Sequence, residues 1–153
     1  MPLVTVSADD DRVDVTWSLT VAPAHAWDGL SSARGLHRWL GELIDGEIAP
    51  NSTFTIDHGQ GYPCSSTVEI FEPGLALAYS WTFPDEPYSR VEWRIEPQDT
   101  GTLLHLNHSG LGDLADSYRD GWLAHLIYLE GHLLDTPLPM SMLMTVASTI
   151  GRR

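Results

Sequence analysis

Apolar and polar residues alternate along much of this chain, which is the period of a half-buried β-strand. The clearest case runs from Val13 to Val21, where β-branched residues and Trp17 share the pattern. After Gly41 the same period returns in short segments separated by Gly, Pro and Asn turn residues. These predicted strands lie near residues 43–49, 53–58, 63–72, 75–83, 89–97 and 102–109. Connections this short predict antiparallel hairpins within one sheet.

Helical spacing occurs in three further places. The first predicted helix begins at Pro23, which suits a first helical turn, and extends to Leu30. The second covers residues 36–40, and Gly41 is expected to end it in a left-handed conformation. The third covers residues 114–134 and is the long one. Its apolar stripe consists of Tyr118, Trp122, Leu126, Leu129 and Leu133.

The order of these elements predicts how they pack. A long amphipathic helix that follows an antiparallel sheet buries its apolar face against the apolar face of that sheet. We therefore expect a single domain over residues 1–137. Residues 138–153 form a separate tail, in which Met142, Val146 and Ile150 are spaced for a short amphipathic helix. An apolar tail on an acidic domain can pack on its own sheet, line the mouth of a pocket or cover a partner subunit. The last case would make the protein a homodimer.

Composition narrows the possible partners and the compartment. The chain has 153 residues, with 8 basic and 21 acidic ones, and its formal net charge of -13 repels phosphate backbones. Nucleic acid is therefore excluded as an expected partner. No apolar run approaches the roughly 20 residues of a membrane span. A single cysteine, Cys64, and no apolar leader behind basic residues indicate a cytoplasmic protein.

Three short motifs add a family resemblance that covers about Val13 to Leu134. Residues 26–30 (AWDGL) precede residues 36–41 (LHRWLG), and residues 69–74 (EIFEPG) precede residues 77–81 (LAYSW). Residues 104–110 (LHLNHSG) are followed by the pair Gly121-Trp122. In this order the motifs resemble the START-like or SRPBCC helix-grip superfamily, in the branch named for the activator of the heat-shock-90 ATPase.

The resemblance implies an α+β helix-grip fold. Such a fold is a curved antiparallel sheet of about six or seven strands, with two short helices after the first strand and a long C-terminal helix. The family includes ligand carriers, polyketide-cyclase-like proteins and stress-related proteins. It implies a hydrophobic or amphipathic small molecule held between sheet and helix, and no cofactor. Two alternatives stay open: a cyclase- or hydrolase-like enzyme that uses the same cavity, and a module that contacts a chaperone or client protein.

Bulky side chains that point into this groove are the candidate ligand contacts. They are Trp39, Phe54, Ile56, His58, Tyr79, Trp81, Trp93, Leu106, His108 and Trp122. Large aromatic rings rarely fill space without gaps, which favours a cavity; a filled core is the alternative. In that alternative Trp39 is a structural plug at the wide end of the groove, with His37 and Arg38 in water.

Two histidines are the candidate polar groups of the groove. His108 follows Leu104 and Leu106 on one strand face, and His58 ends a similar series. Either could orient a ligand, or act as general acid or base if the protein is an enzyme. The alternative is a histidine satisfied by backbone or water at a strand end. We expect no metal site, because His105 and His108 lie three apart on a strand and face opposite sides.

Overall fold

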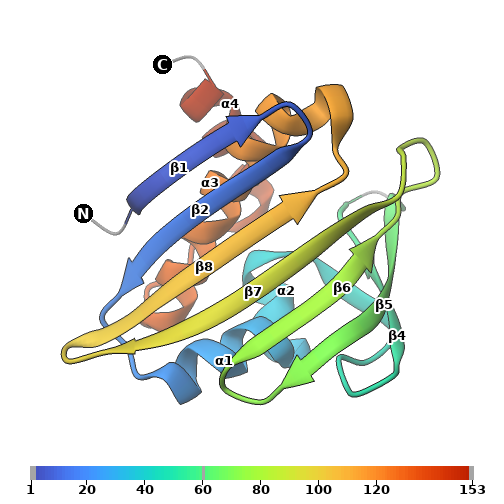
Figure 1. The fold of residues 1–153 in the computed structure, drawn as a ribbon. Helices are drawn as coiled ribbons and strands as arrows, with labels where there is room; N and C mark the ends of the chain where they lie inside the picture. Colours follow the sequence, from blue (N-terminus) through green and yellow to red (C-terminus); the bar gives the residue numbers. More distant parts are fainter. Residues whose placement is uncertain (1–2, 60, 152–153) are drawn as a thin grey trace.

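The computed structural model describes residues 3–59 and 61–151, which form an antiparallel sheet with helices against one face (Figure 1). The strand order is β1-β2-β8-β7-β6-β5-β4-β3. The strands are β1 (Leu3–Asp9), β2 (Arg12–Leu19), β3 (Glu42–Gly46), β4 (Thr53–Asp57), β5 (Pro63–Glu72), β6 (Ala76–Trp81), β7 (Ser89–Gln98) and β8 (Gly101–Ser109). The helices are α1 (Pro23–Ser31), α2 (Ala33–Trp39), α3 (Ala115–Leu133) and α4 (Leu143–Gly151). This is the α+β helix-grip arrangement expected from the sequence, with α3 as the gripped helix.

The sheet has eight strands instead of the expected six or seven. The added strand, β1, forms an antiparallel edge hairpin with β2, and Asp10 in the turn has a φ of 43°. Most β1 side chains are exposed or half-buried. Val4, Val6 and Ala8 alternate with Thr5 and Ser7 in β1, but both valines are exposed, so this alternation does not mark a buried face.

The two short helices are joined by side chains as well as by the chain itself. The Ser32 side chain caps α2 by accepting a hydrogen bond from the Gly35 N–H at 3.0 Å. Trp39, at the end of α2, is fully buried and donates its Nε1–H to the Gly29 carbonyl of α1 at 2.7 Å. His37 and Arg38 are exposed, as expected. Trp39 thus fastens α2 to α1 beneath the sheet.

A glycine is needed at position 41 for a different reason from the one we expected. It does not adopt the left-handed conformation, and the helix closes through the Leu40 and Gly41 N–H groups, which both bond to the Leu36 carbonyl. Instead, β4 passes very close: a Cβ added to Gly41 would lie 2.6 Å from the Asp57 carbonyl oxygen and 2.7 Å from an Ile56 methyl group. Gly41 is therefore required by the close approach of β4.

We expect Gly41→Ala to lower the free energy of unfolding by about 2 kcal/mol, because the backbone of β4 must move to admit a methyl group. Gly121→Ala is the control. A Cβ at Gly121, in the middle of α3, would meet no atom within 4 Å, so helix propensity should raise the free energy of unfolding by up to about 1 kcal/mol. Urea unfolding of both variants measures this. Equal effects of the two substitutions would contradict the close-approach explanation.

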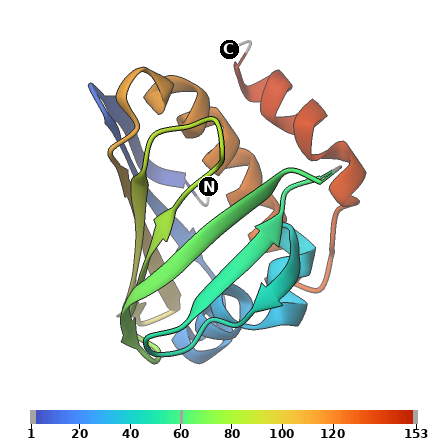
Figure 2. The same ribbon diagram turned by 90° about the vertical axis from the view of Figure 1, so that its right-hand side faces the viewer.

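The helices lie on the same side of the sheet, and α4 packs against α3, farther from β2 and β8 than α3 is (Figure 2). Tyr128 of α3 donates a hydrogen bond to the Pro139 carbonyl at 2.6 Å, which ties down the segment before α4. Met140, Leu143 and Val146 are half-buried against the core. The tail therefore packs on its own domain in this structure. No helix within the described residues is long and apolar enough to cross a membrane.

Candidate functional site

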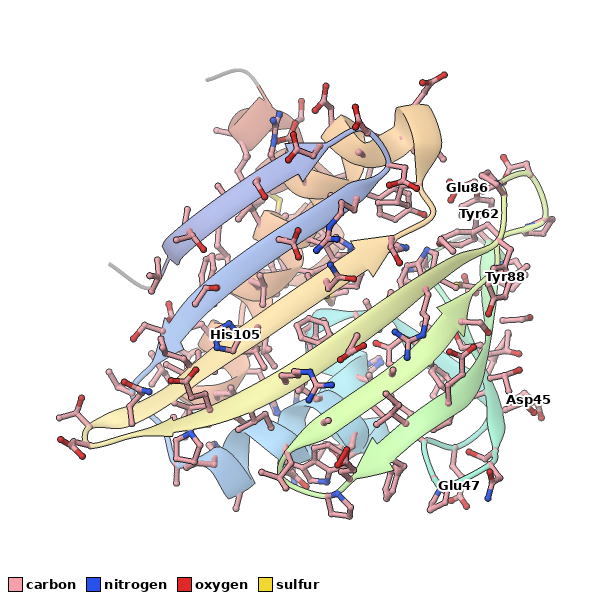
Figure 3. All side chains as sticks on the ribbon, in the orientation of Figure 1. Asp45, Glu47, Tyr62, Glu86, Tyr88 and His105 are labelled. Atoms are coloured by element: carbon pink, nitrogen blue, oxygen red, sulfur yellow. The ribbon has the colours of Figure 1, made fainter. Side chains whose placement is uncertain are left out.

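A hollow of about 280 Å³ lies at one end of α3, where the β6–β7 loop (residues 82–88) and α4 approach it. Figure 3 labels Tyr62 and Glu86, which lie together at this end of the molecule. Aromatic side chains and histidines dominate the lining. The lining residues are His58, Tyr62, Trp81, Phe83, Glu86, Ser117, Tyr118, Gly121, Trp122, His125 and Met144.

The aromatic wall is built from neighbouring elements and is mostly edge-to-face. Trp81, at the end of β6, has its ring centroid 5.3 Å from Trp122 of α3 and 5.2 Å from His58. Tyr62 stacks on Phe83 at 4.3 Å with an interplanar angle of 9°. Trp81 and Phe83 are buried, so these rings are held by the core behind them. The wall is therefore a rigid apolar surface.

His58 is the unsatisfied polar group of this hollow. Its Nε2 is shielded from solvent and has no hydrogen-bond partner among the described residues. Burial, with a smaller contribution from His125, lowers the pKa of His58 to about 3, so the ring is neutral at pH 7. A buried nitrogen without a partner is costly and commonly marks a place for water or ligand.

His125 lies opposite His58, with ring centroids 6.2 Å apart. Its Nδ1 is 2.7 Å from the Trp39 carbonyl oxygen. Because a carbonyl only accepts, Nδ1 carries the hydrogen, and Nε2 of the neutral ring is left as an acceptor. Burial lowers the pKa of His125 to about 4 in spite of this bond. Both histidines of the hollow are therefore neutral at pH 7.

A short polar chain closes the other side of the hollow. Trp81 donates its Nε1–H to the Tyr118 hydroxyl at 2.9 Å, and Tyr118 donates to Glu86 at 2.5 Å. Burial and the Glu86 hydrogen bond raise the pKa of Tyr118, which keeps it protonated. The carboxylate of Glu86 therefore sits at the rim, supported by the aromatic wall.

His108, the other candidate histidine, lies in the core and outside this lining. The Trp122 indole donates to its Nδ1 at 2.9 Å, so the neutral ring carries its hydrogen on Nε2, which lies 2.8 Å from Ser89 Oγ. Ser89 in turn donates to the Trp81 carbonyl. Burial lowers the pKa of His108 to about 3. Both nitrogens are used by side chains, where we had considered backbone or water.

The structure brings three of the ten candidate contacts to the hollow: His58, Trp81 and Trp122. The other seven are buried in the core and do not line it: Trp39, Phe54, Ile56, Tyr79, Trp93, Leu106 and His108. Tyr79 and Trp93 satisfy each other, since the Trp93 Nε1–H donates to the Tyr79 hydroxyl at 3.0 Å.

Several lining residues were not found from the sequence. Tyr118, Trp122 and His125 fall at spacings of four and three on one helix, so His125 could have been placed beside Trp122. Tyr62, Phe83 and Glu86 come from turns and loops, and Met144 comes from the tail. Their convergence depends on the tertiary fold.

Neighbouring features offer less chemistry. A second hollow, of about 360 Å³, shares two lining residues with the first, His58 and Met144. Another, of about 300 Å³, is lined mainly by charged and imidazole side chains, among them Arg34, Arg38 and His132. Burial raises the pKa of the Cys64 thiol to about 12, which makes it unreactive. Within residues 3–59 and 61–151, no three His, Cys, Asp or Glu side chains are grouped to hold a metal ion.

The antiparallel sheet grips the long helix α3, and the two short helices α1 and α2 lie between β2 and β3 in the chain. This arrangement defines a helix-grip protein of the START-like or SRPBCC class. The chain belongs to the family of Activator of Hsp90 ATPase homolog 1-like proteins, whose model matches residues 20–133. The resemblance inferred from the three motifs is confirmed. A search of curated proteins found no match.

Solved structures with the same fold include CalU16 from Micromonospora echinospora, with a TM-score of 0.80 and 21% identity over 99% of this chain and 95% of that one. MLL2253 from Mesorhizobium loti has a TM-score of 0.74 and 26% identity over 81% and 96% of the two chains. DynU16, from the dynemicin biosynthetic locus, has a TM-score of 0.75 and 24% identity over 82% of this chain and 48% of that one. These likenesses confirm the helix-grip fold.

Proposed function

We propose that this protein binds a small, ring-bearing and largely apolar molecule in the hollow bounded by His58, Trp81, Tyr118, Trp122 and Met144. The observation that carries the proposal is His58 Nε2, which has no partner among the described residues and lies within an aromatic wall beside a second neutral histidine. A bound ligand that hydrogen-bonds to this nitrogen would remove the cost of leaving it unsatisfied.

The size and lining of the hollow suit one class of ligand. Small-molecule sites are mostly apolar, with a few polar groups that orient the ligand, and span about 300–1,000 Å³. At about 280 Å³, this one fits a molecule of one or two fused rings. A longer ligand would extend into the second hollow, which requires Met144 to move aside. Met144 lines both hollows and is 77% exposed. DynU16, a protein of similar fold, comes from a biosynthetic locus, which agrees with a small-molecule partner.

Binding is better supported than catalysis by the histidines of the hollow. A general base works best when its pKa is near the operating pH. With pKa values of about 3 and 4, His58 and His125 are weak bases at pH 7 and serve better as neutral hydrogen-bonding groups. His108, the other candidate base, has both nitrogens occupied in the core. The enzyme alternative therefore rests on the fold alone.

Gly121→Phe tests the proposal without removing any existing contact. Gly121 lines the hollow, and a Cβ there meets open space, so a phenyl group can occupy the ligand's place. We expect wild type to bind the neutral test compound 2-naphthylmethanol saturably, and Gly121→Phe to weaken that binding at least tenfold, which corresponds to about 1.4 kcal/mol. Isothermal titration calorimetry measures both.

Gly121→Ala is the matched control, since it shares the backbone change but adds only a methyl group. It should bind within about twofold of wild type, and both variants should keep the wild-type unfolding temperature or exceed it, as helix propensity favours them. Undiminished binding by a folded Gly121→Phe protein would place the ligand elsewhere. Absence of any binding of 2-naphthylmethanol by wild type would count against the proposed function itself.

A further inference from the structure

The hydrogen-bond donors around the hollow are almost all in use. Tyr118 donates its only hydroxyl hydrogen to Glu86, Tyr62 donates to Asp85, and Ser117 donates to the Leu114 carbonyl. The indole hydrogens of Trp81 and Trp122 and the Nδ1 hydrogen of His125 are engaged as described above. What these groups leave for a ligand are acceptors: the Glu86 carboxylate, the Tyr118 oxygen and His125 Nε2. His58 is the exception, because no hydrogen bond among the described residues fixes which nitrogen of its neutral ring carries the hydrogen, so its Nε2 can donate or accept.

The charges at the hollow have a single sign. Within residues 3–59 and 61–151 no arginine lines it, the chain contains no lysine, and the lining histidines are neutral at pH 7. Among the described lining residues the charged one is Glu86, and Asp85, which is next to it in the loop, accepts the Tyr62 hydroxyl hydrogen. The net charge of -13 adds a long-range potential of the same sign. A carboxylate or sulfonate ligand would meet only repulsion here.

The aromatic wall supplies the third part of the argument. The faces of indole, phenol and phenyl rings carry negative potential and attract cations, most strongly when the site is shielded from water. Four aromatic residues line the hollow together with Glu86: Trp81 from β6, Phe83 from the β6–β7 loop, Tyr62 from the segment before β5, and Tyr118 from α3, which bonds to Glu86 directly. A positive group beside Glu86 would therefore find a carboxylate and ring faces together.

We propose that the hollow selects an amine: a ring-bearing apolar body that carries a protonated nitrogen, with the ammonium group donating to Glu86 and the acceptors around it. This inference rests on the proposed function and adds the charge of the ligand to it. The rings of the ligand pack on Trp81 and Trp122, and the ammonium group lies toward the β6–β7 loop. Neutral alcohols bind with lower affinity, and organic acids bind least.

A series of test compounds with one naphthalene body checks this at pH 7 and 0.15 M salt. The compounds are 2-naphthylmethylamine, which is protonated at this pH, the neutral 2-naphthylmethanol and the anionic 2-naphthoate. We expect the amine to bind at least tenfold more tightly than the alcohol, and the naphthoate to bind more weakly than both. Titration calorimetry gives the three affinities directly.

Glu86→Gln assigns the preference to one carboxylate. Glutamine can still accept the Tyr118 hydrogen bond, so the wall should remain in place while the charge is lost. We expect the advantage of the amine over the alcohol, taken as the ratio of their affinities for the same variant, to fall to threefold or less. Glu72→Gln is the control: it removes the same charge from an exposed position at the end of β5 and should keep the preference.

The outcomes separate the two proposals. If the alcohol binds and Gly121→Phe blocks it, but the amine binds no better than the alcohol, then the amine inference is wrong and the proposed function stands. A preference for the amine that Glu72→Gln reduces as much as Glu86→Gln would reflect the overall charge, and would also overturn the inference. If none of the three compounds binds, both proposals fall.

Discussion

Acidification from pH 7 to pH 5 is expected to remove a large part of the stability of this protein. Burial lowers the pKa values of His58 and His108 to about 3 and that of His125 to about 4, from an ordinary value of 6.5. The unfolded chain therefore takes up protons below pH 6.5 that the folded chain does not, and stability falls as the pH falls. At pH 5 one such histidine costs about 2 kcal/mol, and three cost on the order of 6 kcal/mol.

That loss is comparable with the whole free energy of unfolding of a typical domain, about 5–15 kcal/mol. Ion-paired carboxylates do not account for it. Hydrogen bonds from Arg90 lower the pKa values of Glu69 and Glu92, whose ordinary value is 4.5, so their contribution is lost only at lower pH. The window between pH 6.5 and pH 5 therefore reports on the histidines.

Urea unfolding at pH 7, 6 and 5 measures the effect, and the slope of stability against pH gives the number of protons taken up. His108→Gln should reduce that slope by about one proton, whatever it does to stability at pH 7. His37→Gln, at an exposed position of α2, is the matched control for the substitution itself. A flat profile between pH 7 and pH 5 would contradict the buried neutral histidines.

Trp122→Ala is the second large change, with an expected loss of about 4 kcal/mol in the free energy of unfolding. The indole is fully buried and its ring centroid lies 5.3 Å from Trp81 and 5.5 Å from Trp93. Removing it opens a cavity and leaves Nδ1 of the buried His108 without a donor. Trp122→Phe keeps much of the volume but loses the hydrogen bond, and should cost about 2 kcal/mol.

Guanidinium unfolding monitored by circular dichroism measures these variants. Tyr88→Ala is the control, since this ring is exposed and bonds only to a surface carboxylate of Glu69, and it should change stability by less than about 1 kcal/mol. If the Trp122→Ala protein were as stable as wild type, the packing of Trp122 on Trp81 and Trp93 would not stabilise the core. The predicted instability also explains why Gly121→Phe, and not Trp122→Ala, is the test of ligand binding.

Most of the fold could be predicted from the sequence because burial imposes a period on it. The alternation in β2 and the stripe of α3 both arise from one face packing on the other, and both elements lie within two residues of their predicted bounds. β1 was missed although Val4, Val6 and Ala8 alternate with polar residues, and it pairs with β2 at the edge of the sheet with both valines exposed. Gly41 was assigned the wrong cause because the approach of β4 is a tertiary fact.

The candidate site could be predicted only in part. The sequence indicates which side chains point inward, but it does not indicate which hydrogen-bond partners they meet there. His58 and His108 both follow apolar residues and both turn inward. His108 meets Ser89 and Trp122, which use both nitrogens, whereas Nε2 of His58 meets no partner among the described residues. Likewise, Trp39 and Trp93 were both candidate ligand contacts with a filled core as the alternative, and in the structure they meet edge-to-face at 5.7 Å within the core.

Nuclear magnetic resonance of the histidine imidazoles, with 2-naphthylmethanol added to the wild-type protein, tests the central claim most directly. If the hollow is the binding site, the ring signals of His58 and His125 and the methyl signal of Met144 shift together and saturate. The ring of His105, on the outer face of the sheet (Figure 3), keeps its signal. Saturable shifts at His105, or at His132 in the hollow lined by Arg34 and Arg38, would contradict the assignment of the site if the signals of His58 and His125 did not move.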